Sequence, residues 1–173
     1  MVFMPKMTPD NSQILLIRLI EFVPENIVFE DALTVFTMMH DIAIITPDEE
    51  GLADGETIIF DFKGFQTRHL AKIGISVLRC FIKYLIDAHP LRIKGVHIVN
   101  SHSLLDKLLM LSRPFLGAKA MEMIHFHLPN STTLFDFVPK NCLPHEFEGN
   151  FGPIETLKWF WINRTDDHRS VNC

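Results

Sequence analysis

Two of the nine histidines in this chain have a spacing that could support metal chemistry. His125 and His127 lie two residues apart in a short apolar segment, so in an extended strand their imidazoles point to the same side. Zinc sites in proteins use three or four ligands, and no carboxylate or cysteine accompanies this pair at ligand spacing. Distant histidines such as His97 or His102 would have to complete a set. The sequence therefore favours a chain without a metal ion or any other cofactor.

Motifs for covalent catalysis and for nucleotide binding do not occur in the sequence. The chain has no GxSxG nucleophile elbow, no GxxxxGKS/T phosphate loop and no GxGxxG turn. Cys80 and Cys142 stand in apolar or turn contexts without a cationic motif, so neither context favours a reactive thiolate. We therefore expect a protein that is not an enzyme.

Composition is typical of one compact domain in a reducing compartment. The chain has 173 residues, a formal net charge of -5 and 47% hydrophobic residues. This length suits a single domain, and the negative charge argues against nucleic acid as the main partner. No apolar run reaches the roughly 18 residues of a membrane-spanning helix, and the N-terminus has no signal-peptide pattern. Three cysteines without a CxxC pair do not indicate a disulfide framework. We expect a cytoplasmic protein, and a monomer.

Strand and helix patterns alternate along the chain. Short, continuously apolar stretches rich in β-branched residues predict buried strands. Pro90 ends one predicted helix and Pro114 interrupts another. This alternation predicts an α/β fold with a mainly parallel sheet flanked by helices. The predicted strands span 13–18, 56–61, 96–100 and 123–127, and the predicted helices span 29–45, 67–73, 75–88, 103–111 and 131–137.

Four segments carry a family resemblance in their order and spacing. They are GETIIFDFKGFQTRHL, the apolar helix ISVLRCFIKYLIDAHP, then PLRIKGVHIVNSHSLLDKLLMLSRPFLGAK, and finally LPHEFEG. The chain thereby resembles the CRAL-TRIO (Sec14-like) lipid-binding domain, in its tocopherol-transfer and retinaldehyde-binding branch. The resemblance implies an α/β fold that encloses an apolar pocket closed by a mobile gate helix. It implies a lipid-binding domain over 13–152, preceded by a tail (1–12) and followed by a C-terminal helix and tail (153–173).

The helix predicted at 75–88 is apolar around most of its circumference, which requires burial on nearly all sides. From composition alone, the central helix of an ordinary α/β domain explains this pattern. The resemblance implies instead that one side faces a bound lipid, and that the Leu-rich segment 103–119 is the gate rather than a packed surface helix. Tyr84, the only tyrosine, is the one evident hydrogen-bond donor of such a pocket. The ligand-binding residues that the resemblance implies are Met38, Ile42, Phe60, Ile73, Phe81, Tyr84, Leu85, Leu91 and Ile93, with Leu105, Leu108 and Leu109 from the gate.

Four basic residues are candidates for contact with anionic lipid head groups. Arg92 and Lys94 are two residues apart in extended chain, so their side chains point the same way. The resemblance implies that this pair binds phosphoinositides together with Lys119, just after the gate, and Arg113, before its Pro-Phe. Arginine suits bidentate phosphate contacts, and lysine acts as a point charge. The alternative is that all four are ordinary solvated residues.

The chain departs from the family pattern in two places. The family usually has a small helical bundle before this domain, whereas Met1 here lies a dozen residues from the first predicted strand. We therefore expect a form without that helical module: a shortened isoform, an incomplete sequence or a minimal paralogue. In LPHEFEG, relatives typically have two adjacent glycines after the aromatic residue, and Glu148 replaces the first. Because glycine there serves an unusual backbone conformation, Glu148 puts the local geometry and lipid transfer in question.

These features together predict non-enzymatic, intracellular binding and transfer of a small hydrophobic lipid, such as a tocopherol, a retinoid or a similar isoprenoid. Phosphoinositides at a membrane surface would assist docking and release. An almost wholly apolar pocket disfavours a phospholipid, whose head group needs buried polar partners. The alternative is a degenerate Sec14-like module that acts in protein interaction or membrane docking without transferring lipid. A small hydrolase-like enzyme is disfavoured by the missing nucleophile motif.

Overall fold

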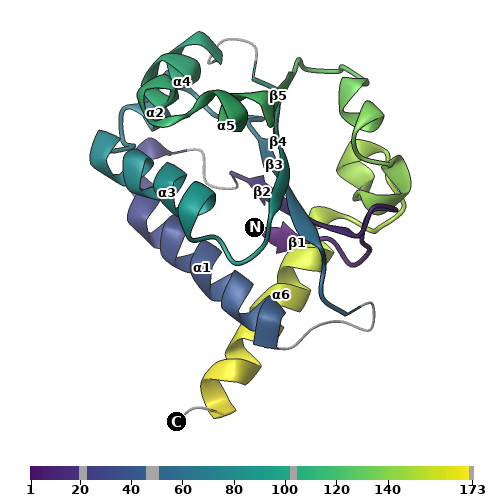
Figure 1. Ribbon diagram of the computed structural model, residues 1–173. Helices are drawn as coiled ribbons and strands as arrows, with labels where there is room; N and C mark the ends of the chain where they lie inside the picture. The colour runs from purple at the N-terminus through teal and green to yellow at the C-terminus, as the bar shows by residue number, and fades with distance from the viewer. Residues whose placement is uncertain (20–22, 46–50, 102–104, 172–173) are drawn as a thin grey trace.

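The computed structural model describes residues 1–19, 23–45, 51–101 and 105–171, which form an α/β structure (Figure 1). Its centre is a five-stranded sheet in the order β1-β2-β3-β4-β5. β1 pairs with β2 in the antiparallel direction and the other pairs are parallel, which confirms the predicted mainly parallel sheet. The strands are β1 (Val2–Phe3), β2 (Ser12–Arg18), β3 (Gly55–Asp61), β4 (Ile93–Val99) and β5 (Ile124–His127).

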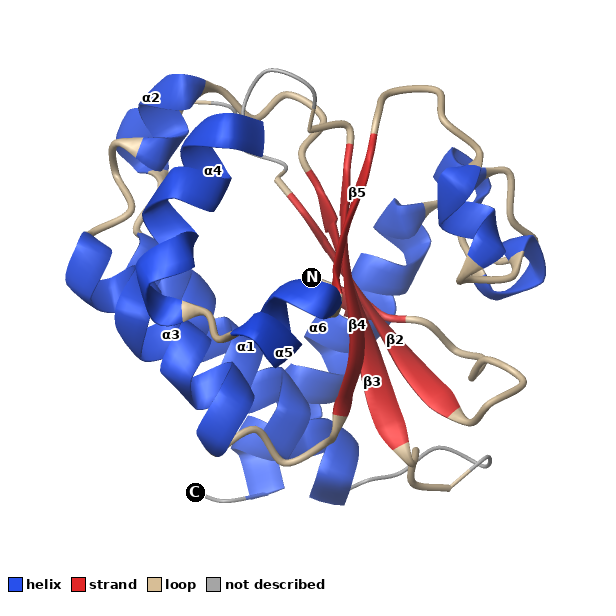
Figure 2. Cartoon of the chain, turned by 45° about the horizontal axis from the view of Figure 1, so that its top comes forward, coloured by secondary structure: helices blue, strands red, loops and turns tan. Residues whose placement is uncertain are grey.

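Long helices flank one side of the sheet and short 3-10 turns cover the other (Figure 2). Pro90 lies just beyond the end of α3 and Pro114 directly after α4, as the sequence predicts. The α-helices are α1 (Phe29–Ile45), α2 (Thr67–Leu70), α3 (Ile75–Asp87), α4 (Leu105–Ser112), α5 (Ala118–Glu122) and α6 (Ile154–Val171). The 3-10 turns are η1 (Pro24–Asn26), η2 (Arg113–Phe115), η3 (Thr133–Asp136), η4 (Lys140–Cys142) and η5 (His145–Phe147).

The helix predicted at 131–137 is instead the single 3-10 turn η3. The hydroxyl of Ser131 accepts a hydrogen bond from the backbone N–H of Thr133 at 3.2 Å. Such local side-chain bonds compete with helical ones, and they favour turns at Ser and Thr positions. The helix prediction is therefore wrong, because it rests on apolar spacing and leaves out the local hydrogen bonds that Ser and Thr side chains form in turns.

One face of the sheet is defined by the pairing register of its parallel strands. Leu15 pairs with Ile58, and Ile58 pairs with Val96, so these three side chains lie on the same face. Glu56 lies two residues before Ile58 and points the same way, and it contacts His40 on α1. This face therefore meets the long helices, and we call it the helix-covered face.

The opposite face, here called the turn-covered face, carries Ile59, His97 and His127. The ring of His127 is hydrogen-bonded to the hydroxyl of Thr133, at 2.8 Å, so this face meets η3. The segment from η3 to η5 supplies much of the core on this side. Its buried apolar residues, with those of β2, are Ile14, Leu16, Leu134, Val138, Cys142 and Leu143.

The first twelve residues, expected to be a tail outside the domain, contain β1 and contribute to the core. Val2, Phe3 and Met4 are each at most 2% exposed. The indole N–H of Trp161, on α6, donates to the carbonyl oxygen of Phe3 at 3.1 Å. A two-residue strand gives no periodic pattern, so the sequence held no signal for it.

The C-terminal helix expected after residue 153 is α6, which contacts β1 and α1. Charged residues such as Arg164 and Asp166 interrupt its apolar sequence. None of the helices in the described ranges is both long and apolar enough to cross a membrane.

Candidate functional site

Beyond Glu56, the helix-covered face is apolar along β3, β4 and β5, yet several of its side chains are only half-buried. Phe60, Val96, Ile124 and Phe126 are all half-buried, although α3, α4 and α5 flank this side of the sheet (Figure 2). Ile98 is buried, at 6% exposure. Parallel strands covered by helices normally bury such side chains completely. Part of the apolar surface of these strands is therefore left uncovered by the helices.

The helix α3 turns one apolar side to the protein and another to solvent. Leu78 and Ile82 are each 8% exposed, whereas Ile75 and Ile86 are 60% and 51% exposed. The expectation that this helix is buried on nearly all sides is therefore wrong. The reason is that its neighbours α1 and α4 each cover one arc of its surface and do not enclose it.

Many predicted ligand-binding residues meet around one core. Ile42 on α1 is part of the buried cluster, and other predicted residues are partly buried against it. Met38 and Ile73 are half-buried as well. The predicted residues packed against the core cluster are Phe60, Phe81, Tyr84, Leu85 and Ile93.

The remaining predicted ligand-binding residues lie elsewhere. Leu91 lines a small cavity beside His40 and Trp161, on the side of the core near α6. Leu109, on α4, is half-buried, and α4 contacts α3. The side chains of Leu105 and Leu108 lie outside the described part of the structure.

Three of the four predicted head-group residues are exposed: Arg92, Arg113 and Lys119. Arg92 precedes β4 and Lys119 lies in α5, which precedes β5, so both are near the amino-terminal end of neighbouring parallel strands. The ammonium of Lys94 instead forms an ion pair with Asp10, at 3.1 Å, and donates to the carbonyl oxygen of the same residue. Lys94 is therefore held by a carboxylate, and the other three face solvent.

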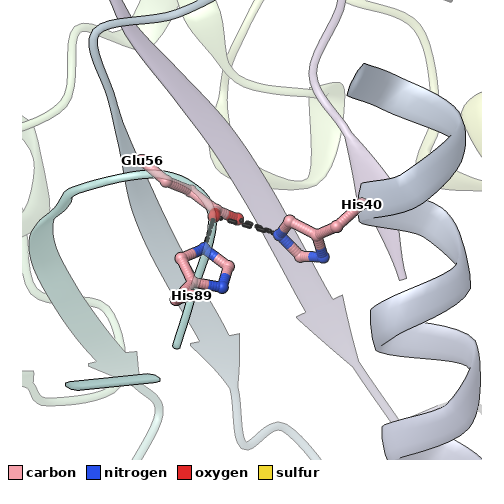
Figure 3. A group of neighbouring side chains, drawn as sticks. All are labelled: His40, Glu56 and His89. Atoms are coloured by element: carbon pink, nitrogen blue, oxygen red, sulfur yellow. Dashed lines mark hydrogen bonds and ion pairs between the residues drawn. The ribbon is translucent and has the colours of Figure 1, made fainter. Parts of the chain in front are cut away.

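A buried polar cluster lies at the amino-terminal end of β3 (Figure 3). Both carboxylate oxygens of Glu56 are 3.0 Å from Nε2 of His40, and Oε2 also contacts Nε2 of His89. The Glu56 side chain is 0% exposed, and the two imidazoles are each 1% exposed. Burial alone raises the pKa of Glu56. Hydrogen bonds from His40 and His89, and the charges of these rings, outweigh burial, so the pKa of Glu56 lies below its ordinary value.

The sequence did not predict this cluster because its members are far apart in the chain. His40 and His89 are 16 and 33 positions from Glu56. One signal was present: Glu56 is a carboxylate in a strand that is apolar on both faces, and a buried charge must be paired. The sequence could not say which residues pair with it.

The second histidine group lies on the turn-covered face. His125 and His127 share this face, as their spacing predicts, and Nδ1 of His97 is 3.0 Å from Nε2 of His127. Burial, followed by the charges of His127 and His125, lowers the pKa of His97 to about 3. Within the described ranges, the only three side chains whose donors come together as metal ligands would are those of the Glu56 cluster. The His125 pair gains no third ligand among these residues.

Comparison with known proteins agrees with this architecture. The model of the CRAL/TRIO domain matches residues 1–149, which is most of the chain. The chain belongs to the CRAL/TRIO domain family. This family is known for lipid-binding and transfer proteins.

Individual relatives of this CRAL/TRIO chain are longer than the part they share with it. An alpha-tocopherol transfer protein-like protein of Mus musculus is 28% identical over 157 residues, covering 90% of this chain and 45% of the relative. Clavesin-1 of Xenopus laevis is 31% identical over 118 residues, covering 68% of this chain and 36% of the relative. The chain thus spans less than half the length of these relatives. The crystal structure of Sfh5 matches with a TM-score of 0.63 at 12% identity, over 90% of this chain and 56% of that one, and shows the fold alone.

The LPHEFEG element of this CRAL/TRIO domain keeps its unusual backbone despite the missing glycine. Glu148 adopts φ 56° and ψ 25°, in the left-handed region, and its carboxylate pairs with Lys140. A Cβ atom on the next residue, Gly149, would lie 1.9 Å from the carbonyl oxygen of Leu143. The conformation that favours glycine at the first position is therefore present, and the second position has no room for any side chain.

Proposed function

We propose that the chain binds a small hydrophobic molecule, such as a tocopherol, retinoid or similar isoprenoid, between α3, α4 and strands β3 to β5. The observation that carries this proposal is the set of half-buried apolar side chains on β3, β4 and β5. Phe60, Val96 and Phe126 belong to it on the sheet, and Phe81 and Leu85 on α3. The name of the matched alpha-tocopherol transfer protein-like relative fits a ligand of this kind.

The energetics favour an apolar ligand with a single small polar group. Burial of about fifteen methylene or methyl carbons is worth on the order of 10 kcal/mol, at roughly 0.8 kcal/mol per group. Burial, and then the charges of Asp41 and Glu56, raise the pKa of Tyr84, so its hydroxyl remains a neutral donor at physiological pH. A hydroxyl or carbonyl on the ligand would use this donor.

The segment α4–η2 is the proposed gate. Pro114 breaks the helix just after α4, and Gly117 lies between η2 and α5, so the chain here is divided into short elements. Leu109, Phe115 and Leu116 are half-buried on it. At a membrane, these side chains exchange their contacts in the pocket for contacts with acyl chains. They therefore remain out of water when the gate opens. Release is therefore proposed to occur at a membrane.

The exposed residues Arg92, Arg113 and Lys119 are proposed to contact phosphoinositide head groups, and Lys94 to exchange Asp10 for a phosphate. We expect Arg92→Ala with Lys94→Ala to weaken binding to phosphoinositide vesicles by at least several-fold, with ligand capacity intact. A double variant of α3, Arg79→Ala with Lys83→Ala, removes two exposed cations elsewhere and is the matched control. Equal vesicle affinity of the two double variants would exclude this docking surface.

Native mass spectrometry of the purified chain, followed by solvent extraction, tests ligand binding itself. A stoichiometric lipid of a few hundred daltons would support the proposal and identify the ligand class. An apo mass that does not change after incubation with tocopherol, retinoids and phospholipids would favour a docking module that does not transfer lipid.

A further inference from the structure

Three residues from separate elements bring two imidazoles and a carboxylate together in the interior (Figure 3). They are His40 on α1, Glu56 on β3, and His89 in the connection from α3 to β4. One donor atom of each lies within 4.8 Å of the others. The proposed lipid site is built from apolar side chains and does not use this group, so its role needs a separate explanation.

The hydrogen bonds of His40 determine where its proton sits. Nδ1 lies 2.7 Å from the carbonyl oxygen of Phe36, which can only accept, so Nδ1 carries a hydrogen and donates it. In the neutral ring, Nε2 is then a bare lone pair directed at the two oxygens of Glu56. Acceptors at this distance repel each other unless a positive charge lies on or between them. A proton on Nε2 provides that charge, and so does a metal cation.

Two features are suited to a metal cation in place of this proton. Nε2 of His40 is 3.0 Å from both oxygens of Glu56. A single N–H can be shared by both oxygens in a bifurcated hydrogen bond, and a cation can equally be held by both oxygens of a carboxylate. In addition, an N–H donated to a backbone carbonyl is a usual outer contact of metal-bound histidine, because it fixes the tautomer and makes the other nitrogen more basic. His40 is therefore presented as a metal ligand.

We propose that His40, Glu56 and His89 form a zinc site that ties α1 to β3 and to the connection between α3 and β4. Imidazole nitrogen and carboxylate oxygen are ordinary Zn²⁺ ligands at about 2.0–2.2 Å, and imidazole is a poor ligand for Mg²⁺ or Ca²⁺. Donors around a tetrahedral zinc at these bond lengths are about 3.3 Å apart, whereas Nε2 of His40 is 3.0 Å from both oxygens of Glu56 and Nε2 of His89 is 2.5 Å from Oε2. The imidazole of His89 must therefore move away from Glu56 by about 0.8 Å to admit the ion.

A cavity next to His40 offers room for a fourth ligand. Its volume is about 40 Å³, which exceeds the roughly 15 Å³ that one ordered water needs. Gln13 and Arg164 bring polar groups to its wall. Of the three proposed ligands only His40 lines this cavity, so a water that completes a four-coordinate zinc would have to approach the ion from the His40 side. Its other lining residues are Phe3, Ala43, Ile44, Gly51, Leu52, Ala53, Leu91 and Trp161.

Aromatic rings surround the cluster. The rings of Phe36 and Phe3 lie 4.3 and 5.0 Å from that of His40, and the ring of Tyr84 lies 5.6 Å from that of His89. These rings pack against the imidazoles and limit the access of water to the cluster. With one carboxylate, a zinc centre carries a net charge of +1.

The two histidines are not equivalent ligands. Nδ1 of His89 is buried without a hydrogen-bond partner among the described residues, whereas Nδ1 of His40 bonds to Phe36. A ligand without such an outer contact is less basic and less well oriented. His89 is therefore the weaker ligand of the site, and its substitution should lower the affinity for zinc less than substitution of Glu56.

The test is zinc binding by the full chain, purified, stripped with a chelator and returned to equimolar Zn²⁺. We expect about one zinc per chain to survive desalting, and a rise in Tm on the order of 5 °C. Glu56→Gln preserves side-chain size and should weaken binding by at least about 100-fold, and His89→Gln by less. His125→Gln, on the turn-covered face, is the matched control and should keep wild-type affinity.

Cobalt separates this site from adventitious binding to cysteine. Co²⁺ in the wild-type chain should give the visible absorption of a four-coordinate nitrogen and oxygen site, without a thiolate charge-transfer band. If Glu56→Gln does not fold, the cobalt spectrum of the wild-type chain still tests whether the metal site exists. Absence of that spectrum, loss of zinc in His125→Gln, or a folded Glu56→Gln with wild-type affinity would overturn the proposal, and the cluster would be held by protons alone. None of these outcomes depends on lipid binding.

Discussion

The two faces of the sheet differ in how completely their apolar side chains are buried. On the turn-covered face, Ile14 and Ile59 are 0% exposed, as is Leu143 in the covering turns. On the helix-covered face, Phe60 and Val96 remain half-buried. Both faces have protein over them, so the difference lies in how closely the cover fits. A closely fitted face stabilises the fold, whereas a loosely fitted one keeps apolar surface for another molecule.

The loose fit is local to one part of the helix-covered face. Leu15 and Ile58 lie on that face and are 0% exposed, near β1 and the polar cluster. Half-buried side chains appear toward β4 and β5, where α3, α4 and α5 flank the sheet. One face of the sheet thus has a fully buried half and a half-buried half, and the proposed lipid site lies on the second.

The largest predicted effect is on the cover of the turn-covered face. Gly149→Ala places a Cβ 1.9 Å from the carbonyl oxygen of Leu143 and 2.7 Å from that of Lys140, and both contacts are with backbone. The turn that carries η5 must then shift, so we expect a loss of about 4 kcal/mol in the free energy of unfolding, measured by urea denaturation. Gly117→Ala is the control, because nothing lies within 4 Å of its added Cβ. Similar losses in both variants would contradict the steric argument.

A matched pair of Leu→Ala substitutions compares the two faces directly. Leu143→Ala removes a fully buried side chain and should cost about 3 kcal/mol of unfolding free energy. Leu85→Ala removes a half-buried side chain on α3 and should cost about 1 kcal/mol. The order should reverse for lipid retained on purification, which Leu85→Ala lowers and Leu143→Ala does not. Equal stability losses would mean that the two faces are packed alike.

Much of the fold could be predicted from the sequence because its signals are local. The apolar stretch before Asp61 and the helix that ends before Pro90 correspond to β3 and α3. β1 could not be predicted, since two residues carry no periodicity and their partner strand begins at Ser12. The exposed flank of α3, with Ile75, was also missed, because composition does not report how many neighbours a helix has.

The candidate site was predictable only in part, for a physical reason. Phe81 and Leu85, which are proposed to line the lipid site, were expected there from the family resemblance alone. The contact of Lys94 with Asp10 and the cluster around Glu56 depend on pairings between distant segments. A single sequence shows that a buried charge needs a partner, and the fold decides which residue that is.

The stability of the protein should depend on pH, because tight packing of the turn-covered face buries His97. Burial lowers the pKa of His97 to about 3, from 6.5 for an ordinary histidine. Between these values the unfolded chain binds a proton that the folded chain excludes, so stability falls as the pH falls below about 6.5. The expected loss from His97 is about 1.4 kcal/mol per pH unit, and His127, also shifted downward, adds in the same direction.

His97→Gln isolates this contribution, because only the slope of stability against pH is compared. Urea denaturation at pH 6.5, 5.5 and 4.5 should give a slope for the variant that is smaller by about 1.4 kcal/mol per unit. A loss of stability that is the same at every pH does not change this slope, so the substitution itself does not disturb the comparison. A slope equal to that of the wild-type protein would show that His97 takes up its proton in the folded state.

The smallest predicted effect concerns Glu148, where the cover of the turn-covered face holds a strained residue. A left-handed conformation costs a residue with a side chain roughly 1 kcal/mol, and glycine does not bear this cost. Glu148→Gly should therefore raise the free energy of unfolding by up to about 1 kcal/mol, less the entropy that glycine adds to the unfolded chain. Glu148→Ala keeps the strain and removes the contact with Lys140, so it should not stabilise. If alanine stabilised as much as glycine, the carboxylate rather than the backbone would be the source of the cost. If only the glycine variant raises the free energy of unfolding, the turn-covered face tolerates Glu148 at the cost of a small backbone strain. The helix-covered face need not change when this strain is removed.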